Sequence, residues 1–68
     1  MMNKEELQYY LDKNKKIKIT LKNNFRYNGK ILELFETSLR FEDKFDGVLT
    51  IPYEEIRLIS EIGGGHNE

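Results

Sequence analysis

The 68-residue chain contains no cysteine, one proline and one histidine. Without cysteine the fold has neither disulfides nor thiolate metal ligands. The histidine, His66, has no second candidate ligand near it in the sequence, so we expect no zinc site and no other cofactor. Because a domain of this size buries only about 60% of the surface that its unfolded chain exposes, association with further subunits is the expected source of additional stability.

Long apolar runs are missing as well. No stretch approaches the ~20 apolar residues of a membrane helix, and the charged start Lys4-Glu5-Glu6 leads into no apolar signal segment. We therefore expect a soluble, cytoplasmic protein without a membrane partner. The chain also lacks a Ser-His-Asp set, a metal cluster and a phosphate-binding glycine loop, and the neighbouring carboxylates Glu54 and Glu55 are typical of solvated surface. A binding or assembly protein is expected, not an enzyme.

The charges are divided unevenly along the chain, although the formal net charge is only −1. Residues 1–30 carry eight basic and three acidic side chains, whereas residues 31–68 carry three basic and nine acidic ones. A basic half of this kind indicates a surface for a polyanion. Pairing between the two halves, or plain solvation of the charges, explains the same distribution equally well.

The first segment has the pattern of a short amphipathic helix. Asn3 is a good N-cap, and the acids that follow it suit a helix N-terminus. An apolar stripe at i, i+3 and i+4 spacing is formed by Leu7, Tyr10 and Leu11. The pattern predicts a helix over residues 4–13 that stops at Asn14.

A period of two replaces the helical period after this segment. Apolar and polar residues alternate over 16–22 and again over 25–31, which predicts two strands joined by an Asn23-Asn24 turn. Gly29 lies inside the second strand, where a glycine usually marks a sharp bend or a close backbone approach.

Three more short strands are predicted around residues 39–42, 48–51 and 56–62. An Asp46-Gly47 turn precedes the second of these, and Pro52 with a tight helical turn ends it. The pattern predicts a mostly β fold, in which a short N-terminal helix precedes a strongly bent, five-stranded antiparallel SH3-like barrel, closed or nearly closed. One domain spans residues 1–62, and a flexible glycine-rich tail spans 63–68. The expected core consists of Ile17, Ile19, Leu21, Tyr27, Ile31, Leu34, Leu39, Phe41, Leu49, Ile51, Ile56 and Ile59.

The motif Ile17-x-Ile19-x-Leu21-x-Asn23-Asn24-x-x-Tyr27-x-Gly29-x-Ile31 looks like the first motif of the Sm and Sm-like family, which includes bacterial Hfq. Residues 51–59 fall where the second Sm motif would lie, and the resemblance spans about residues 4–62. It implies a Sm-like barrel that forms a ring of identical subunits and binds single-stranded RNA. The second segment departs from the family at Pro52-Tyr53, where the second Sm motif has an Arg-Gly pair, so the family's uridine pocket is not reproduced.

Single-stranded RNA is held by flat side chains that stack on bases and by cations that follow the phosphates. Phe25 and Tyr27 lie close in sequence to several basic residues, and the resemblance implies that this stretch lies near the face on which Hfq takes purine-rich strands. The candidate RNA-binding residues are Asn24, Phe25, Arg26, Tyr27, Asn28 and Lys30, with Lys15 and Lys16 as a basic rim. Tyr27 also fits a core position, and Phe25 a cover over the mouth of the barrel.

Two other functions fit the same sequence. The first is a Sm-like or SH3-like module that assembles with other proteins and has lost RNA binding. The acidic second half and the loop aromatics Phe35, Phe45 and Tyr53 favour this reading. The second is a monomeric barrel associated with the ribosome or with transcription.

Overall fold

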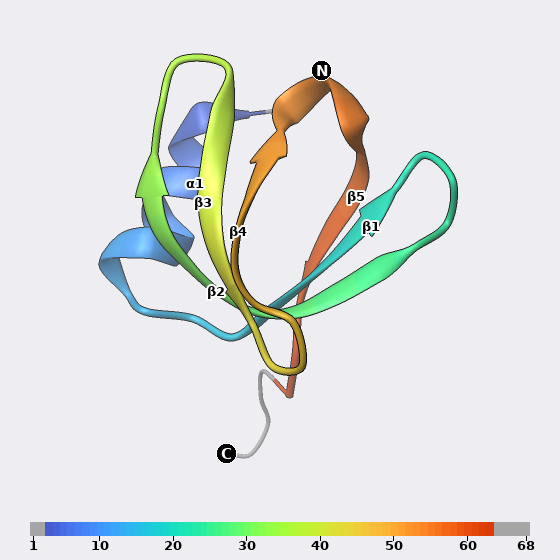
Figure 1. Cartoon of the computed structure of the whole chain (residues 1–68). Helices are drawn as coiled ribbons and strands as arrows, with labels where there is room; N and C mark the ends of the chain where they lie inside the picture. Colours follow the sequence, from blue (N-terminus) through green and yellow to red (C-terminus); the bar gives the residue numbers. More distant parts are fainter. Residues whose placement is uncertain (1–2, 64–68) are drawn as a thin grey trace.

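The computed structural model describes residues 3–63 and shows one helix followed by five strands (Figure 1). The elements are α1 (Lys4–Asp12), β1 (Ile17–Leu21), β2 (Arg26–Leu34), β3 (Ser38–Asp43), β4 (Gly47–Pro52), the 3-10 turn η1 (Tyr53–Glu55) and β5 (Ile56–Glu61). Each predicted helix, strand and helical turn is present. Residues 64–68 of the predicted tail lie outside the described residues.

An asparagine lies at each end of α1: the Asn3 side chain caps its N-terminus, and the Asn14 backbone caps its C-terminus. The Asn3 side chain accepts hydrogen bonds from the backbone N–H groups of Glu5 and Glu6. Asn14 adopts a left-handed φ of 54°, and its N–H donates to the Leu11 carbonyl over 3.1 Å. This C-terminal cap satisfies carbonyls that the helix leaves free. It ends the helix at Asp12, one residue earlier than predicted.

The strands form one antiparallel sheet in the order β4-β3-β2-β1-β5. β2 lies in the middle and is shared, since its first half pairs with β1 and its second half with β3. Figure 1 shows β2 sweeping in one long curve from the β1 side of the molecule to the β3 side. Within residues 3–63 no hydrogen-bonded ladder joins β4 to β5, so the sheet is open. The barrel that the sequence predicted is therefore not closed by strand pairing.

Gly29 lies where β2 changes partners. It is opposite Ile17 of β1 and also opposite Asp43 of β3. A Cβ atom at this position would overlap the backbone carbonyl of Glu42 and come within 3.2 Å of the Phe41 ring. The predicted close backbone approach is therefore confirmed, and only glycine leaves room for it.

The core lies between the curved sheet and α1. The largest side chains that are fully buried come from both layers, namely Leu7, Ile17, Ile19, Leu39 and Phe41. The predicted core residues are either buried or packed against this cluster. The helix adds Leu7 and also Tyr10, whose hydroxyl donates to Glu6 over 2.8 Å. Burial, together with Glu6, raises the pKa of Tyr10 to about 12, so this hydroxyl remains a donor at neutral pH.

Replacing Gly29 with alanine should strongly destabilise the fold, because the added methyl group collides with backbone and not with a movable side chain. We expect a loss of at least about 2 kcal/mol in the free energy of unfolding, measured by urea denaturation. Gly47→Ala is the matched control: Gly47 has open space around it and a φ of 77°, so only backbone strain of about 1 kcal/mol applies. Equal losses in the two variants would contradict the role given to Gly29.

Candidate nucleic-acid interface

The alternation of β2 divides the predicted RNA-binding residues between two faces of the sheet. Tyr27 is opposite Ile19 in the β1 ladder, so it lies on the core face. Arg26 and Asn28 are opposite Thr20 and Lys18, on the outer face. Stacking rings and most of the predicted cations are therefore not on a single surface.

Phe25 lies at the end of the β1–β2 hairpin, with 51% of its surface exposed. Its ring packs edge to face on the half-buried Tyr27, with 4.9 Å between ring centroids. Its backbone N–H donates to the Asn23 side chain over 3.0 Å, and its carbonyl accepts from Leu21 over 2.8 Å. Asn24 completes the turn at a φ of 71°. The Phe25 ring is thus fixed at its base and open to solvent on one side.

Arg57 joins this surface from a distant part of the chain. A register shift between β1 and β5 leaves Arg57 as the extra residue of β5, between partners of Leu21 and Thr20. Such bulges redirect side chains, and here a guanidinium nitrogen donates to the Asn24 side-chain oxygen over 3.1 Å. Lys22 and Arg57 both line one hollow. We call Lys22, Asn24, Phe25, Tyr27 and Arg57 the hairpin surface.

Arg57 was not among the residues that the sequence singled out. One signal was available, since adjacent apolar residues at Leu58 and Ile59 break the alternation of the strand and indicate a bulge. The contact between Arg57 and Asn24 spans 33 positions. No local pattern encodes a contact of that range.

Lys15 and Lys16 do not form a common rim. The Lys15 ammonium lies 3.1 Å from the Glu61 carboxylate, which ties the segment after α1 to the end of β5. The hydrogen bond and charge of Glu61 raise the pKa of Lys15. Lys16 is exposed and precedes β1 on the opposite side of the alternation from Ile17. Lys15 therefore has a structural partner, and Lys16 remains open to solvent.

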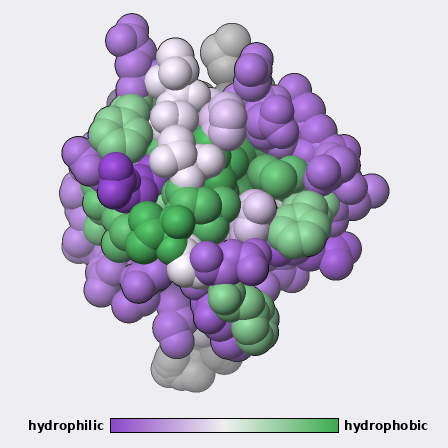
Figure 2. All heavy atoms as spheres, in the orientation of Figure 1, coloured by the Kyte–Doolittle hydropathy of each residue, from purple (hydrophilic) through white to green (hydrophobic). Residues whose placement is uncertain are grey.

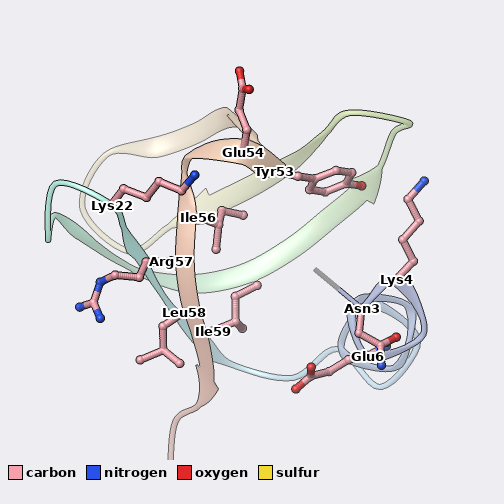
Figure 3. Close-up of a pocket in the computed structure, with 10 residues that line it drawn as sticks. All are labelled: Asn3, Lys4, Glu6, Lys22, Tyr53, Glu54, Ile56, Arg57, Leu58 and Ile59. Carbon is pink, nitrogen blue, oxygen red and sulfur yellow. The ribbon is translucent and has the colours of Figure 1, made fainter. Parts of the chain in front are cut away.

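A hollow runs along β5, between this strand, η1 and the first turn of α1 (Figure 3). Ile56 and Ile59 point toward the helix side of it, and Arg57 and Leu58 point away. The Lys4 ammonium lies 5.9 Å from the centre of the Tyr53 ring. This hollow borders the unpaired edge of β5.

The opposite edge of the sheet, β4, is also unpaired in the described structure. Val48 on β4 and Leu58 on β5 are both more than half exposed. Figure 2 shows apolar side chains gathered near the middle of the face on which β4 runs, with polar ones around them. Both edges thus combine free backbone groups with exposed apolar side chains.

Asp43 organises the β3–β4 turn from a buried position, with 5% of its surface exposed. Its two carboxylate oxygens accept hydrogen bonds from the backbone N–H groups of Asn28, Phe45 and Asp46, over 2.8 to 2.9 Å. Burial raises the pKa of Asp43, but the hydrogen bonds from Asp46, Phe45, Asn28 and Lys44 outweigh it, and the net pKa is lowered. The turn is consequently held from inside by a charged group.

Residues 3–63 contain no group of three or more histidine, cysteine or acidic side chains placed to hold a metal ion. In the same residues no helix has the length and apolar character needed to cross a membrane. Comparison with protein-family models, with curated proteins and with solved structures gave no match to this chain.

Replacing Asp43 with asparagine should weaken the turn, because an amide group turns an N–H toward N–H donors. We expect a loss of about 1–3 kcal/mol in the free energy of unfolding at pH 7. Because the folded-state pKa lies below 3.8, the contribution of the carboxylate is present above about pH 4 and is lost as the pH falls through the folded-state pKa. The difference between wild type and variant should therefore shrink at about pH 3.

Urea denaturation at both pH values measures this difference. Asp46→Asn is the control, since Asp46 is exposed and only its backbone takes part in the turn. If Asp43→Asn and Asp46→Asn had the same urea midpoint at pH 7, the structural role of the Asp43 carboxylate would be refuted.

Proposed function

We propose that this chain is a Sm-like protein, which assembles through its sheet edges into a homo-oligomeric ring and binds single-stranded RNA on the hairpin surface. The arrangement of elements supports the first part. A short helix, five antiparallel strands and a central strand bent at Gly29 follow the order that the sequence resemblance implies. The curvature of β2 brings the sheet toward a barrel-like form, which neighbouring subunits would complete.

RNA binding rests on one observation: Phe25 is half exposed in a hairpin turn, and the side chain of its neighbour Asn24 accepts a hydrogen bond from the Arg57 guanidinium. A phenyl ring offers a sequence-tolerant platform for a base, worth about 1–3 kcal/mol. Arg57 and Lys22 supply the positive charge that a phosphate needs. In the described residues no carboxylate lies within 4.0 Å of either cation, so both are free to contact a phosphate.

The departures from the Sm motif are consistent with RNA binding on the hairpin surface and not in the family's uridine pocket. Pro52 and Tyr53 occupy the positions of the family's Arg-Gly pair, and the Tyr53 hydroxyl is engaged by the Phe35 carbonyl over 2.6 Å. Contacts on the hairpin surface do not depend on that pocket. We therefore place the RNA beside the β1–β2 turn.

Assembly rests on the two unpaired edges. An open strand edge pairs readily with another chain unless it is protected, and neither edge carries a proline before the end of β4. Pairing of β4 in one copy with β5 in the next would be a head-to-tail contact, which gives a ring when the rotation between copies closes and an open filament when it does not. It would also cover Val48 and Leu58.

The alternative is an assembly module that does not bind RNA. The open edges and the acidic second half favour it, because neither feature requires a nucleic acid. The RNA titration described next separates the two functions.

Phe25→Ala should weaken binding of short oligo-A or oligo-U RNA about tenfold, because one stacked base loses its platform. Fluorescence anisotropy at low salt measures the affinity. Phe35→Ala is the matched control, because Phe35 is also partly exposed but lies at the β2–β3 turn. If wild type does not bind RNA below tens of micromolar, the RNA function is refuted. If both variants lose the same affinity, the placement of RNA on the hairpin surface is refuted.

Val48→Lys should break the assembly while leaving the subunit folded, since Val48 is exposed in the single chain and a lysine on an edge strand discourages pairing. Light scattering should give a multiple of the subunit mass for wild type and a lower mass for the variant. Arg40→Lys is the control, because Arg40 lies on β3, inside the sheet. Thr50→Lys would not serve, because Thr50 lies on the same edge strand as Val48. A wild-type mass of one subunit would refute the ring.

A further inference from the structure

A second hollow lies on the far side of the sheet from the core, at the β3–β4 turn. Three lysines converge on it from different elements: Lys16 before β1, Lys30 on β2 and Lys44 in the turn. The remaining lining residues are Asn28, Gly29, Glu42, Asp43 and Ile62, so two carboxylates border this hollow with the three lysines. None of these lysines belongs to the hairpin surface. We call Lys16, Asn28, Lys30, Lys44 and the neighbouring Phe45 the turn groove.

Phe45 is the most exposed of the large apolar side chains, with 82% of its surface open. Its backbone is nevertheless held in place, because its N–H and that of Asp46 both donate to the Asp43 carboxylate over 2.8 Å. Gly47 closes the turn at a φ of 77°. The Lys44 ammonium lies 5.5 Å from the centre of the Phe45 ring. A flat ring and a cation are thus presented together on a braced turn, so binding would cost little ordering entropy.

The charges around the turn groove favour an anion over a cation. Glu42 is opposite Lys30 in the β2–β3 ladder and offsets that one lysine. The Asp43 oxygens are directed at backbone N–H groups. In the described residues no carboxylate lies within 4.0 Å of Lys16 or Lys44. These two lysines are therefore available for a phosphate group.

We propose that the turn groove is a second contact for the same RNA strand, in which Phe45 stacks on a base and Lys16 and Lys44 hold a phosphate. The proposal rests on the proposed function and extends it. Lys16 and Lys22 of the hairpin surface flank β1 and are six positions apart in the sequence, which corresponds to about 20 Å of extended strand. A strand of several nucleotides can bridge that distance along the outer face, where Lys18 lies between the two sites.

The test compares two pairs of variants by anisotropy titration with oligo-A RNA of about 16 nucleotides over a range of salt concentrations. Lys44→Ala is matched with Lys13→Ala, and Phe45→Ala with Phe35→Ala; each pair removes the same side chain inside and outside the groove. A lost phosphate contact lowers the slope of log affinity against log salt by about 0.7 for single strands. We expect this change for Lys44→Ala alone, and about a tenfold weaker affinity for Phe45→Ala alone.

The outcomes separate this proposal from the function on which it rests. If wild type binds RNA and Phe25→Ala impairs it, but the groove variants behave like their controls, the turn groove is not an RNA contact and the function stands. If wild type binds no RNA, both fail. If the groove variants leave the affinity unchanged but alter the solution mass, the groove is a subunit contact and the proposal is overturned.

Discussion

The contact between Gly29 and the Glu42 carbonyl is the constraint on which the rest of the fold depends. Because no side chain stands between β2 and β3 at this point, the two backbones approach closely and β2 can curve away from β1. The curve lets nine residues of one strand serve two halves of the sheet. It also brings core-face residues of both halves, such as Ile19 and Phe41, into one cluster with Leu7 and Tyr10 of α1. A larger residue here would separate the halves and open the core.

The curve of β2 also determines where the candidate binding residues lie. β2 begins at the hairpin surface and passes Asn28 and Lys30 of the turn groove at its bend. Side chains on its core face, such as Tyr27, support the ring of Phe25, whereas those on its outer face meet solvent beside the lysines of β1. Within the proposed function, the hairpin surface and the turn groove act as two separate contacts for one flexible strand and not as a single pocket. Stacking and phosphate contacts of this kind tolerate many sequences.

Local structure could be predicted from the sequence because its causes are local. Alternation identified the strands, Asn3 and Asn14 the ends of the helix, and Gly29 the close approach. The candidate site was only partly predictable: Phe25 and Tyr27 do pack together, but the period-two alternation of β2 separates them from Arg26 and Lys30. Arg57 and the Lys15–Glu61 ion pair depend on how β5 lies against β1, with a bulge between them. That placement arises from tertiary packing, which the alternation of apolar and polar residues in the sequence does not predict.

The proposal that RNA runs over β1 and β2 between the hairpin surface and the turn groove is tested most directly by an NMR titration of the isotope-labelled protein with oligo-A RNA. The account predicts that backbone signals shift in two groups, one at Asn24, Phe25 and Arg57 and the other at Lys16, Lys44 and Phe45. Signals of α1 and η1 should remain in place, apart from those at subunit contacts. Shifts confined to α1 and η1, or no shifts at saturating RNA, would contradict the account.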